Sequence, residues 1–99
     1  NAGKEEKNVQ YFLVSGDYYS KISNYNQAIR HYDIAEIIHR ETNNKNATII
    51  ANILNGRGTI YYNMEEYKKA LRDYDLALSY RNSDVISSNR KRCLSKLNN

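Results

Sequence analysis

The residues with the most versatile side-chain chemistry are two histidines and the acids near them. His31 and His39 are eight residues apart, so on a helix they lie about two turns apart on similar sides. A metal-binding pair on a helix prefers a spacing of three or four residues, and no cysteine or further histidine is correctly placed. Asp33 and Glu36 are close by, but acids and histidines on an outer helix face are usually solvated. We therefore expect no metal site.

The sequence also lacks the residue patterns of nucleophilic catalysis and of phosphate binding. No Ser-His-Asp or Cys-His arrangement can be built from these positions. The segment Gly56-Arg57-Gly58 falls inside an expected helix and lacks the Lys-Ser/Thr that ends a phosphate-binding loop. The single cysteine, Cys93, excludes a disulfide framework or a multi-cysteine zinc site, and we expect it to be a small buried residue. The sequence thus indicates a protein that is not an enzyme and uses no cofactor.

The positive charge of the chain is concentrated at its C-terminal end. The net charge is +4, and residues 81–99 contain five bases against Asp84 alone, whereas the acids and bases of residues 1–80 cancel. Arg90, Lys91 and Arg92 form a basic patch that could attract an acidic ligand or RNA. The patch is a small footprint for nucleic acid, and cations near a final helix also favour its dipole. A nucleic acid is therefore not the expected partner.

The composition of the 99 residues favours an all-α fold. The chain has no proline and 4 glycines, and no sustained polar–apolar alternation, so the tight turns of a β-sandwich or barrel would be hard to build. No apolar run approaches the roughly 18 residues of a membrane span. We expect an intracellular, cytoplasmic protein. Asn1-Ala2 resembles the remnant of a cleaved tag, so residues 1–8 are treated as remnant and lead-in.

The sequence contains an internal repeat, and the repeated segments must form the elements that position the side chains discussed above. At an offset of 42 residues, eight identities fall within residues 16–35. The identical pairs are Gly16/Gly58, Tyr19/Tyr61, Tyr25/Tyr67, Ala28/Ala70, Arg30/Arg72, Tyr32/Tyr74, Asp33/Asp75 and Ala35/Ala77. Their spacing follows helical stripes on each side of a polar break at Ser23-Asn24 or Glu65-Glu66. Each unit is thus expected to be a helix, a tight turn and a second antiparallel helix. Asn24 could cap the second helix of the first unit, and Glu65 and Glu66 suit the N-terminus of the corresponding helix in the second unit.

Five helices are expected from this register. Their expected ranges are 6–22, 25–42, 47–63, 66–81 and 84–97, with a polar turn at 42–46. Gly16 against Ala28, and Gly58 against Ala70, should let the helices of each unit approach closely. The tyrosines should fill the space between units, with each hydroxyl reaching solvent or the backbone. Arg92 occupies the place of the two glycines, so the last helix should cap the array.

The repeated residues resemble the pattern of the tetratricopeptide repeat family. The matching residues are Phe12, Gly16, Tyr19, Ala28, Tyr32 and Ala35, then Leu54, Gly58, Tyr61, Ala70, Tyr74 and Ala77. Ser15 and Arg57 replace the leucine of the pattern, no terminal proline follows, and the offset of 42 exceeds the family period of 34. The resemblance implies an α-solenoid with one repeat at 9–42, a connection at 43–50, a second repeat at 51–84 and a capping helix at 85–99.

The resemblance also implies a concave groove that holds an extended peptide, lined by the first helix of each unit and by the cap. Carried over by position, the groove residues are Leu13, Asp17, Asn52, Asn55, Thr59, Tyr62, Asn89 and Arg90. Asparagine offers both a donor and an acceptor to a peptide backbone, and Arg90 could grip a carboxylate. The leading hypothesis is therefore a module, adaptor or scaffold that binds another protein or peptide.

A sharper version, capture of acidic chaperone tails as in co-chaperones of the family, is not supported. The carboxylate clamp of those members uses Lys, Asn, Asn, Lys and Arg, and the corresponding positions here are Leu13, Asp17, Gly56, Ile86 and Arg90. Only Arg90 fits. Two further hypotheses remain open: a self-assembling domain that buries its helix edges in a homo-oligomer, and acidic-ligand or RNA binding through the C-terminal basic helix.

Overall fold

Helices account for nearly all of the described chain. The computed structural model describes residues 2–43 and 45–98, and within them the backbone forms five α-helices and no strand. The helices are α1 (Ala2–Lys21), α2 (Tyr25–Glu41), α3 (Ala47–Asn63), α4 (Tyr67–Tyr80) and α5 (Asp84–Leu97). The expected all-α class is confirmed. In this described part of the chain, no helix is both long enough and apolar enough to cross a membrane.

The helix boundaries agree with the sequence expectations except at the N-terminus. α1 begins at Ala2, four residues before the expected start, so the residues treated as tag remnant and lead-in are partly helical. The physical reason is the segment Ala2-Gly3-Lys4-Glu5-Glu6-Lys7, in which good helix formers outnumber the single glycine. The expected turn at 42–46 is present on both sides of Asn44, which lies outside the described residues. Asn46 caps α3 through its side chain, which accepts a hydrogen bond from the Ile49 amide at 3.1 Å.

The turn inside each helix pair has the same geometry in both pairs. Ser23 and Glu65, 42 residues apart, both adopt left-handed backbone conformations, with φ of 60° and 63°. The residue after each donates its amide to a carbonyl five residues back, Asn24 to Tyr19 at 2.9 Å and Glu66 to Tyr61 at 2.8 Å. This arrangement closes the C-terminus of a helix and reverses the chain. The Asn24 side chain then caps α2, as expected, by accepting from the Gln27 amide.

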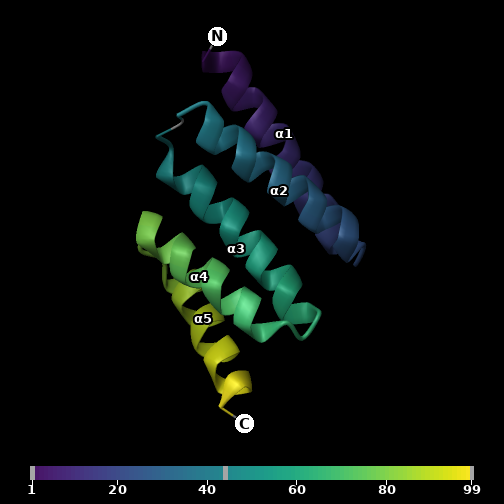
Figure 1. Cartoon of the computed structure of the whole chain (residues 1–99), viewed down its shortest axis with the longest axis vertical. Helices are drawn as coiled ribbons and strands as arrows, with labels where there is room; N and C mark the ends of the chain where they lie inside the picture. Colours follow the sequence, from purple (N-terminus) through teal and green to yellow (C-terminus); the bar gives the residue numbers. More distant parts are fainter. Residues whose placement is uncertain (1, 44, 99) are drawn as a thin grey trace.

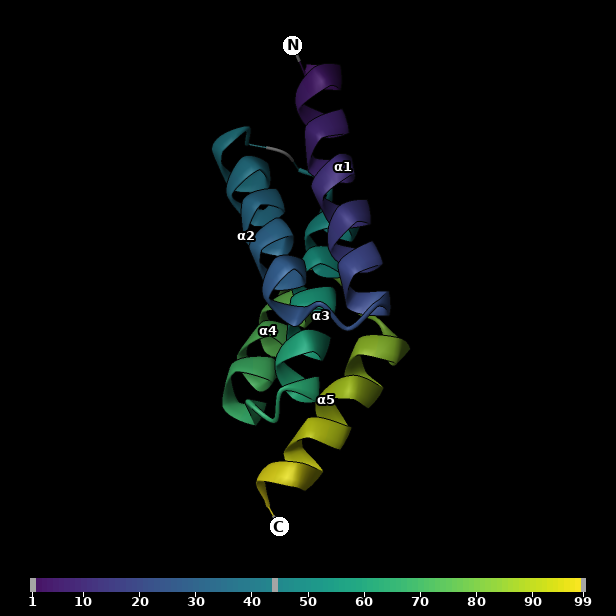
Figure 2. The same cartoon turned by 90° about the vertical axis from the view of Figure 1, so that its right-hand side faces the viewer.

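The helices form a stack of two antiparallel pairs and a final helix. α1 packs mainly on α2, and α3 mainly on α4, while α3 also contacts α1 and α2. α5 follows along the outer side of α4, and the N- and C-termini lie at opposite ends of the stack (Figures 1 and 2). The stack measures 48 × 28 × 18 Å, and α3 lies at its centre, in contact with all four other helices.

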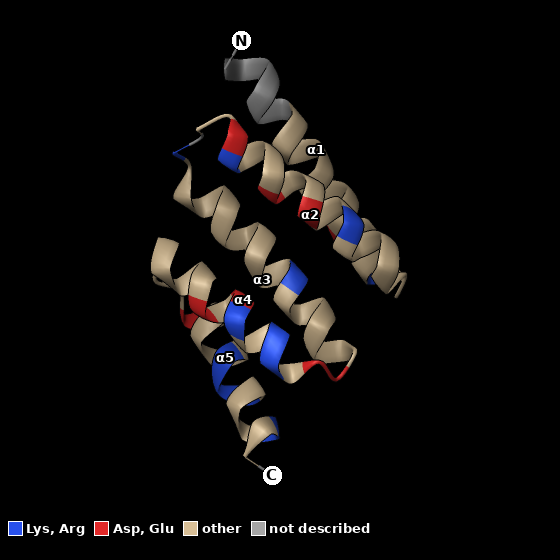
Figure 3. Cartoon of the chain, viewed as in Figure 1, with Lys and Arg blue, Asp and Glu red and all other residues tan. Residues whose placement is uncertain are grey.

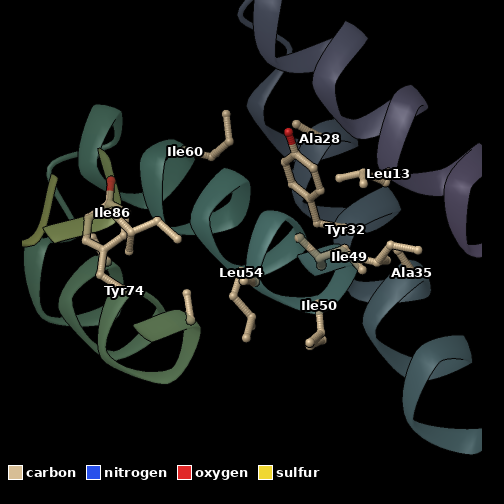
Figure 4. Packing of buried hydrophobic residues seen from close by; sticks show 14 of the residues in the cluster. Leu13, Ala28, Tyr32, Ala35, Ile49, Ile50, Leu54, Ile60, Tyr74 and Ile86 are labelled. Atoms are coloured by element: carbon tan, nitrogen blue, oxygen red, sulfur yellow. The ribbon is translucent and has the colours of Figure 1, made fainter. Parts of the chain in front are cut away.

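Two tyrosines and three glycines form the centre of the packing. The buried Tyr32 ring reaches from α2 toward both α1 and α3 (Figure 4). A Cβ atom added to Gly16 would lie 2.6 Å from the ring, and one added to Gly56 would lie 2.7 Å from it. Tyr74 covers Gly58 in the second pair, with 3.0 Å left for a Cβ atom. The side-chain atoms nearest to these glycines thus belong mainly to tyrosine rings, a contact that the sequence analysis did not predict.

The hydroxyl groups of these buried tyrosines bind side chains, which corrects the expectation of solvent or backbone partners. The Tyr32 hydroxyl donates to the Asp17 carboxylate on α1, and the Tyr74 hydroxyl lies 3.0 Å from the Thr59 hydroxyl on α3. Asp17 and Thr59 are again 42 residues apart. Asp17 directly follows Gly16, and Thr59 directly follows Gly58. Both repeats therefore bind the buried tyrosine hydroxyl from the same position, with a carboxylate in the first and a hydroxyl in the second.

Candidate functional site

The first helices of the repeat place a row of asparagines along one surface. Asn52, Asn55 and Thr59 lie three or four residues apart on one face of α3. On α5, Asn89 is 34 residues after Asn55, and its Nδ2 atom donates to Asn55 Oδ1 at 3.0 Å. The two asparagines therefore hold equivalent positions on neighbouring helices and form a continuous amide surface.

This amide surface continues into an aromatic and cationic group. Arg92 is exposed, donates to Asn89 Oδ1 at 3.3 Å and holds its guanidinium carbon 6.0 Å from the centre of the Tyr62 ring. Tyr62 in turn meets Tyr67 edge to face, with ring centres 5.3 Å apart. We define the α3–α5 strip by the following residues: Asn52, Asn55, Thr59, Tyr62, Asn89 and Arg92. It offers amide groups for a peptide backbone and a stacked ring and cation for a side chain.

A shallow hollow lies beyond the strip, where the N-terminus of α4 meets the C-terminus of α5. It has a volume of about 370 Å³ and is lined by Glu65, Glu66, Tyr67, Lys68, Lys69 and Leu97. Lys69 forms an ion pair with Glu66 at 3.4 Å and lies 5.5 Å from the centre of the Tyr61 ring. Because Tyr67 touches Tyr62, the hollow and the strip share an aromatic border.

Three of the residues predicted for the groove are engaged elsewhere. Leu13 is 7% exposed and belongs to the core, so it has little surface for a ligand. Asp17 is exposed on α1 but accepts the Tyr32 hydroxyl. Arg90 pairs through its Nε atom with Asp75 of α4. We therefore leave these three residues out of the α3–α5 strip, whereas Arg92, expected only as part of the basic patch, enters it.

The basic patch divides into separate environments. Arg90, Lys91 and Arg92 are consecutive on a helix, so their side chains leave it about 100° apart. Arg90 is directed to Asp75 and Arg92 to Tyr62, while Lys91 is exposed. Basic residues recur along α4 and α5 (Figure 3), but these three do not form one surface.

Cys93 lies in the packing between α4 and α5. It is 0% exposed, and its thiol donates to the Tyr67 carbonyl at 3.0 Å. Burial raises the pKa of the thiol, which disfavours the nucleophilic thiolate. The expectation of a small buried residue is met. Among the described residues, no group of three or more histidines, cysteines and acids could hold a metal ion.

An ion cluster around Arg57 is the main polar feature that the sequence analysis missed. Arg57 forms two parallel hydrogen bonds to Asp73 of α4, at 2.8 and 2.9 Å. Its Nη1 atom binds Asp33 and Glu36 of α2, at 2.8 and 2.7 Å. The Arg57 side chain is 14% exposed, and that of Asp73 only 5%. The acidic residues of α2 and the one basic residue of α3, Arg57, are visible in Figure 3.

The charges of this cluster do not balance, because three carboxylates share one guanidinium. Burial raises the pKa of Asp73, and Glu36 and Asp33 add to the rise, against the lowering effect of Arg57. Burial opposes the charge of Arg57, but hydrogen bonds and attraction from Asp73 and Glu36 outweigh it and raise the Arg57 pKa. One feature of the sequence could have indicated this cluster: Arg57, a charged residue, stands where the repeat pattern has leucine.

Comparison with known proteins supports the second helix pair as a repeat of a known kind. A family model described as tetratricopeptide repeat matches residues 51–84, which cover α3 from Ala51 onward, the whole of α4 and the chain up to Asp84, the first residue of α5. The comparison with curated proteins returned no match.

Proposed function

We propose that this chain, whose residues 51–84 match a family model described as tetratricopeptide repeat, binds an extended segment of a partner protein along the α3–α5 strip. Repeats of this family are protein-interaction modules in general. The proposed role is binding, without a catalytic step.

The single observation that carries this proposal is the bond between Asn55 and Asn89. This hydrogen bond, 3.0 Å from Asn89 Nδ2 to Asn55 Oδ1, aligns side-chain amide groups of α3 and α5. Asn52 on the same face of α3 is exposed. An extended peptide has unpaired backbone donors and acceptors, and each asparagine supplies one group of each kind. The bound backbone would therefore replace water, and the exchange would leave no polar group unpaired.

The Tyr62 and Arg92 pair suggests an acidic or amide-bearing residue in the bound segment. Arg92 is exposed and already oriented by Asn89 and the Tyr62 ring, so less side-chain entropy is lost when it binds a ligand. A charge-assisted hydrogen bond from its guanidinium favours a carboxylate. The adjoining hollow would take the next side chain of the partner.

The test uses a displayed library of random peptides selected against the whole chain. Selected peptides are titrated into the ¹⁵N-labelled protein, and we expect shifted amide signals on α3 and α5. Asn52→Ala and Tyr62→Ala should each weaken binding by about tenfold, the loss of one or two net hydrogen bonds or contacts. The matched controls are Asn26→Ala on α2 and Tyr80→Ala on α4, both exposed. Shifts confined to α1 and α2, or equal losses in the controls, would contradict the proposal.

Binding of an acidic ligand or RNA through Arg90, Lys91 and Arg92 has less support, because Arg90 is paired with Asp75 and the three side chains diverge. Self-assembly concerns a different surface and is considered next.

A further inference from the structure

The outer face of α1 carries an exposed apolar stripe, in which Tyr11 and Tyr18 contact the rings of Phe12 and Tyr19 of the same helix. Tyr11, Val14, Tyr18 and Ile22 are 63%, 62%, 58% and 53% exposed. Their spacing of three and four residues places Tyr11, Val14 and Tyr18 on one side of α1, and Ile22, the first residue after the helix, continues this spacing. α1 and α2 form the N-terminal end of the stack (Figure 2). We call these four residues the α1 stripe.

The repeat register shows what such a face does elsewhere in the molecule. Shifted by 42 residues, the first three members of the stripe correspond to Ile53, Gly56 and Ile60 of α3. Ile53 and Ile60 are 0% exposed, and Gly56 lies under the Tyr32 ring of α2. The same helix face is therefore a helix–helix interface in the second pair. On α1 its apolar character is retained, whereas a face meant for water would be polar.

The opposite end of the stack does not complement the α1 stripe. The exposed side chains of α5 include the cations Lys91, Arg92 and Lys96. The packing face of α4 is already covered by Ile86 and Cys93 of α5. A head-to-tail contact would thus press tyrosine and valine against ammonium and guanidinium groups and remove their water. Such a contact would also leave one end of each chain open, so that the assembly would not close.

We infer that two copies of this chain associate through their α1 stripes, with the two helices antiparallel about a twofold axis. An axis near Ser15 places Tyr11 of one copy opposite Tyr18 of the other, so each aromatic ring meets an aromatic ring. Ser15 itself is small, and its hydroxyl already donates to the Tyr11 carbonyl at 2.8 Å. The helices can therefore approach closely at the crossing without burying an unpaired hydroxyl. All four side chains of the stripe are uncharged.

The size of the stripe predicts a weak dimer. Two half-exposed tyrosines, one valine and one isoleucine bury roughly 400 Å² per copy, about half of a standard interface. We expect a dissociation constant on the order of 0.1 mM, because small interfaces retain little free energy after the entropic cost of association. The inference concerns a different surface from the α3–α5 strip and stands or falls independently of it.

Sedimentation equilibrium of the whole chain tests the inference, from about 10 µM to about 1 mM, a range that brackets the expected affinity. The average mass should rise toward twice the monomer mass and no further. Val14→Glu and Tyr18→Glu should keep the chain monomeric, a loss of at least tenfold in association. The matched controls are Val85→Glu and Tyr80→Glu, at residues 66% and 48% exposed on α5 and α4, which should leave the dimer unchanged.

A wild-type chain that stays monomeric at the highest concentration would overturn the inference. So would continued growth beyond the dimer, or a loss of association in the Val85 or Tyr80 variants alone. If a glutamate variant does not fold, as judged by circular dichroism, an isotope-filtered nuclear Overhauser experiment on mixed labelled and unlabelled wild-type chains replaces it. Contacts between copies from Tyr11 to Tyr18 are expected, and intermolecular contacts at α5 instead would contradict the twofold arrangement.

Discussion

At the scale of single residues, the distance between each glycine and the tyrosine ring above it determines how tightly the helices pack. Gly16 and Gly56 hold the Tyr32 ring from two sides, with 2.6 and 2.7 Å available to a Cβ atom. Gly58 leaves 3.0 Å below Tyr74. Real Cβ contacts do not reach the first two distances, so Tyr32 must move if either glycine is replaced.

Replacement of these glycines by alanine should therefore give graded effects. Alanine gains about 1 kcal/mol of helix propensity over glycine, while overpacking costs about 1–3 kcal/mol. We expect Gly16→Ala and Gly56→Ala to lower the free energy of unfolding by up to about 2 kcal/mol, and Gly58→Ala to be nearly neutral, in chemical denaturation. In a Tyr32→Leu variant, Gly16→Ala should lower the free energy of unfolding by less, because the ring that the new Cβ atom would meet is absent. Equal effects at all three glycines would contradict this packing.

The hydroxyl of Tyr32 links stability to alkaline pH. Burial and the neighbouring Asp17 carboxylate raise the pKa of Tyr32 above its usual value of 10.0. Above pH 10 the unfolded chain loses this proton and the folded chain keeps it, so the folded state binds more protons and its stability falls as pH rises. Below pH 10 the contribution is fully present.

Tyr32→Phe should remove this part of the alkaline dependence. Each retained proton contributes about 1.4 kcal/mol per pH unit to the slope of unfolding free energy against pH. Urea denaturation between about pH 9.5 and pH 11 should give a slope smaller by about one proton in the variant. Tyr80→Phe, at an exposed position of α4, serves as the control. An unchanged slope in Tyr32→Phe would show that Tyr32 does not retain its proton.

At the scale of helices, the Arg57 cluster joins α2, α3 and α4 where the family pattern has leucine. The guanidinium contacts three carboxylates and is 14% exposed. The Arg57 guanidinium joins the first helix pair to the second through hydrogen bonds of defined direction. A leucine at this position would make only non-directional apolar contacts. The exposed Arg40, also near Glu36 at 3.9 Å, gives a natural comparison.

Arg57→Leu should be strongly destabilising. Loss of Arg57 leaves Asp73, whose side chain is 5% exposed, buried without its charge partner, which costs about 3–5 kcal/mol. Addition of Asp73→Asn should recover part of this loss. Arg40→Leu, with a side chain 70% exposed, should cost less than about 1 kcal/mol. Thermal and urea unfolding measure all three variants, and similar losses at Arg57 and Arg40 would contradict the role of the cluster.

At the scale of the whole molecule, the contacts of Tyr32 and Arg57 connect the two helix pairs. Tyr32 of α2 rests on Gly56 of α3, and Arg57 of α3 holds Glu36 of α2. In a repeat protein, stability is a sum of unit and interface terms, so strong interface contacts make the pairs unfold together.

Hydrogen exchange should detect this coupling. Gly16→Ala is located on α1, yet we expect it to lower the protection of α3 and α4 amides as well as those of α1 and α2, by up to about 30-fold if unfolding is global. The surface change Ser87→Ala on α5 serves as the control. A loss of protection confined to α1 and α2 would mean that the two pairs unfold independently.

The sequence by itself determined the helices, their order and their turns. Helical periodicity and the polar breaks are local properties, so Asn24, Asn46 and the turn at Glu65 could be placed from neighbouring residues alone. The offset of 42 residues also determined which positions are equivalent. The early start of α1 was missed because the first residues were excluded as a tag.

Only the tertiary structure decided which side chains meet across helices. Leu13 and Arg90 fell at groove positions by register, but packing buried the first and a facing acid, Asp75, engaged the second. Gly56 and Arg57 gained their roles from Tyr32 and Asp73, which lie 24 and 16 residues away in the sequence. Such contacts depend on how helices cross in three dimensions, and periodicity along one helix carries no information about the distance to its neighbour.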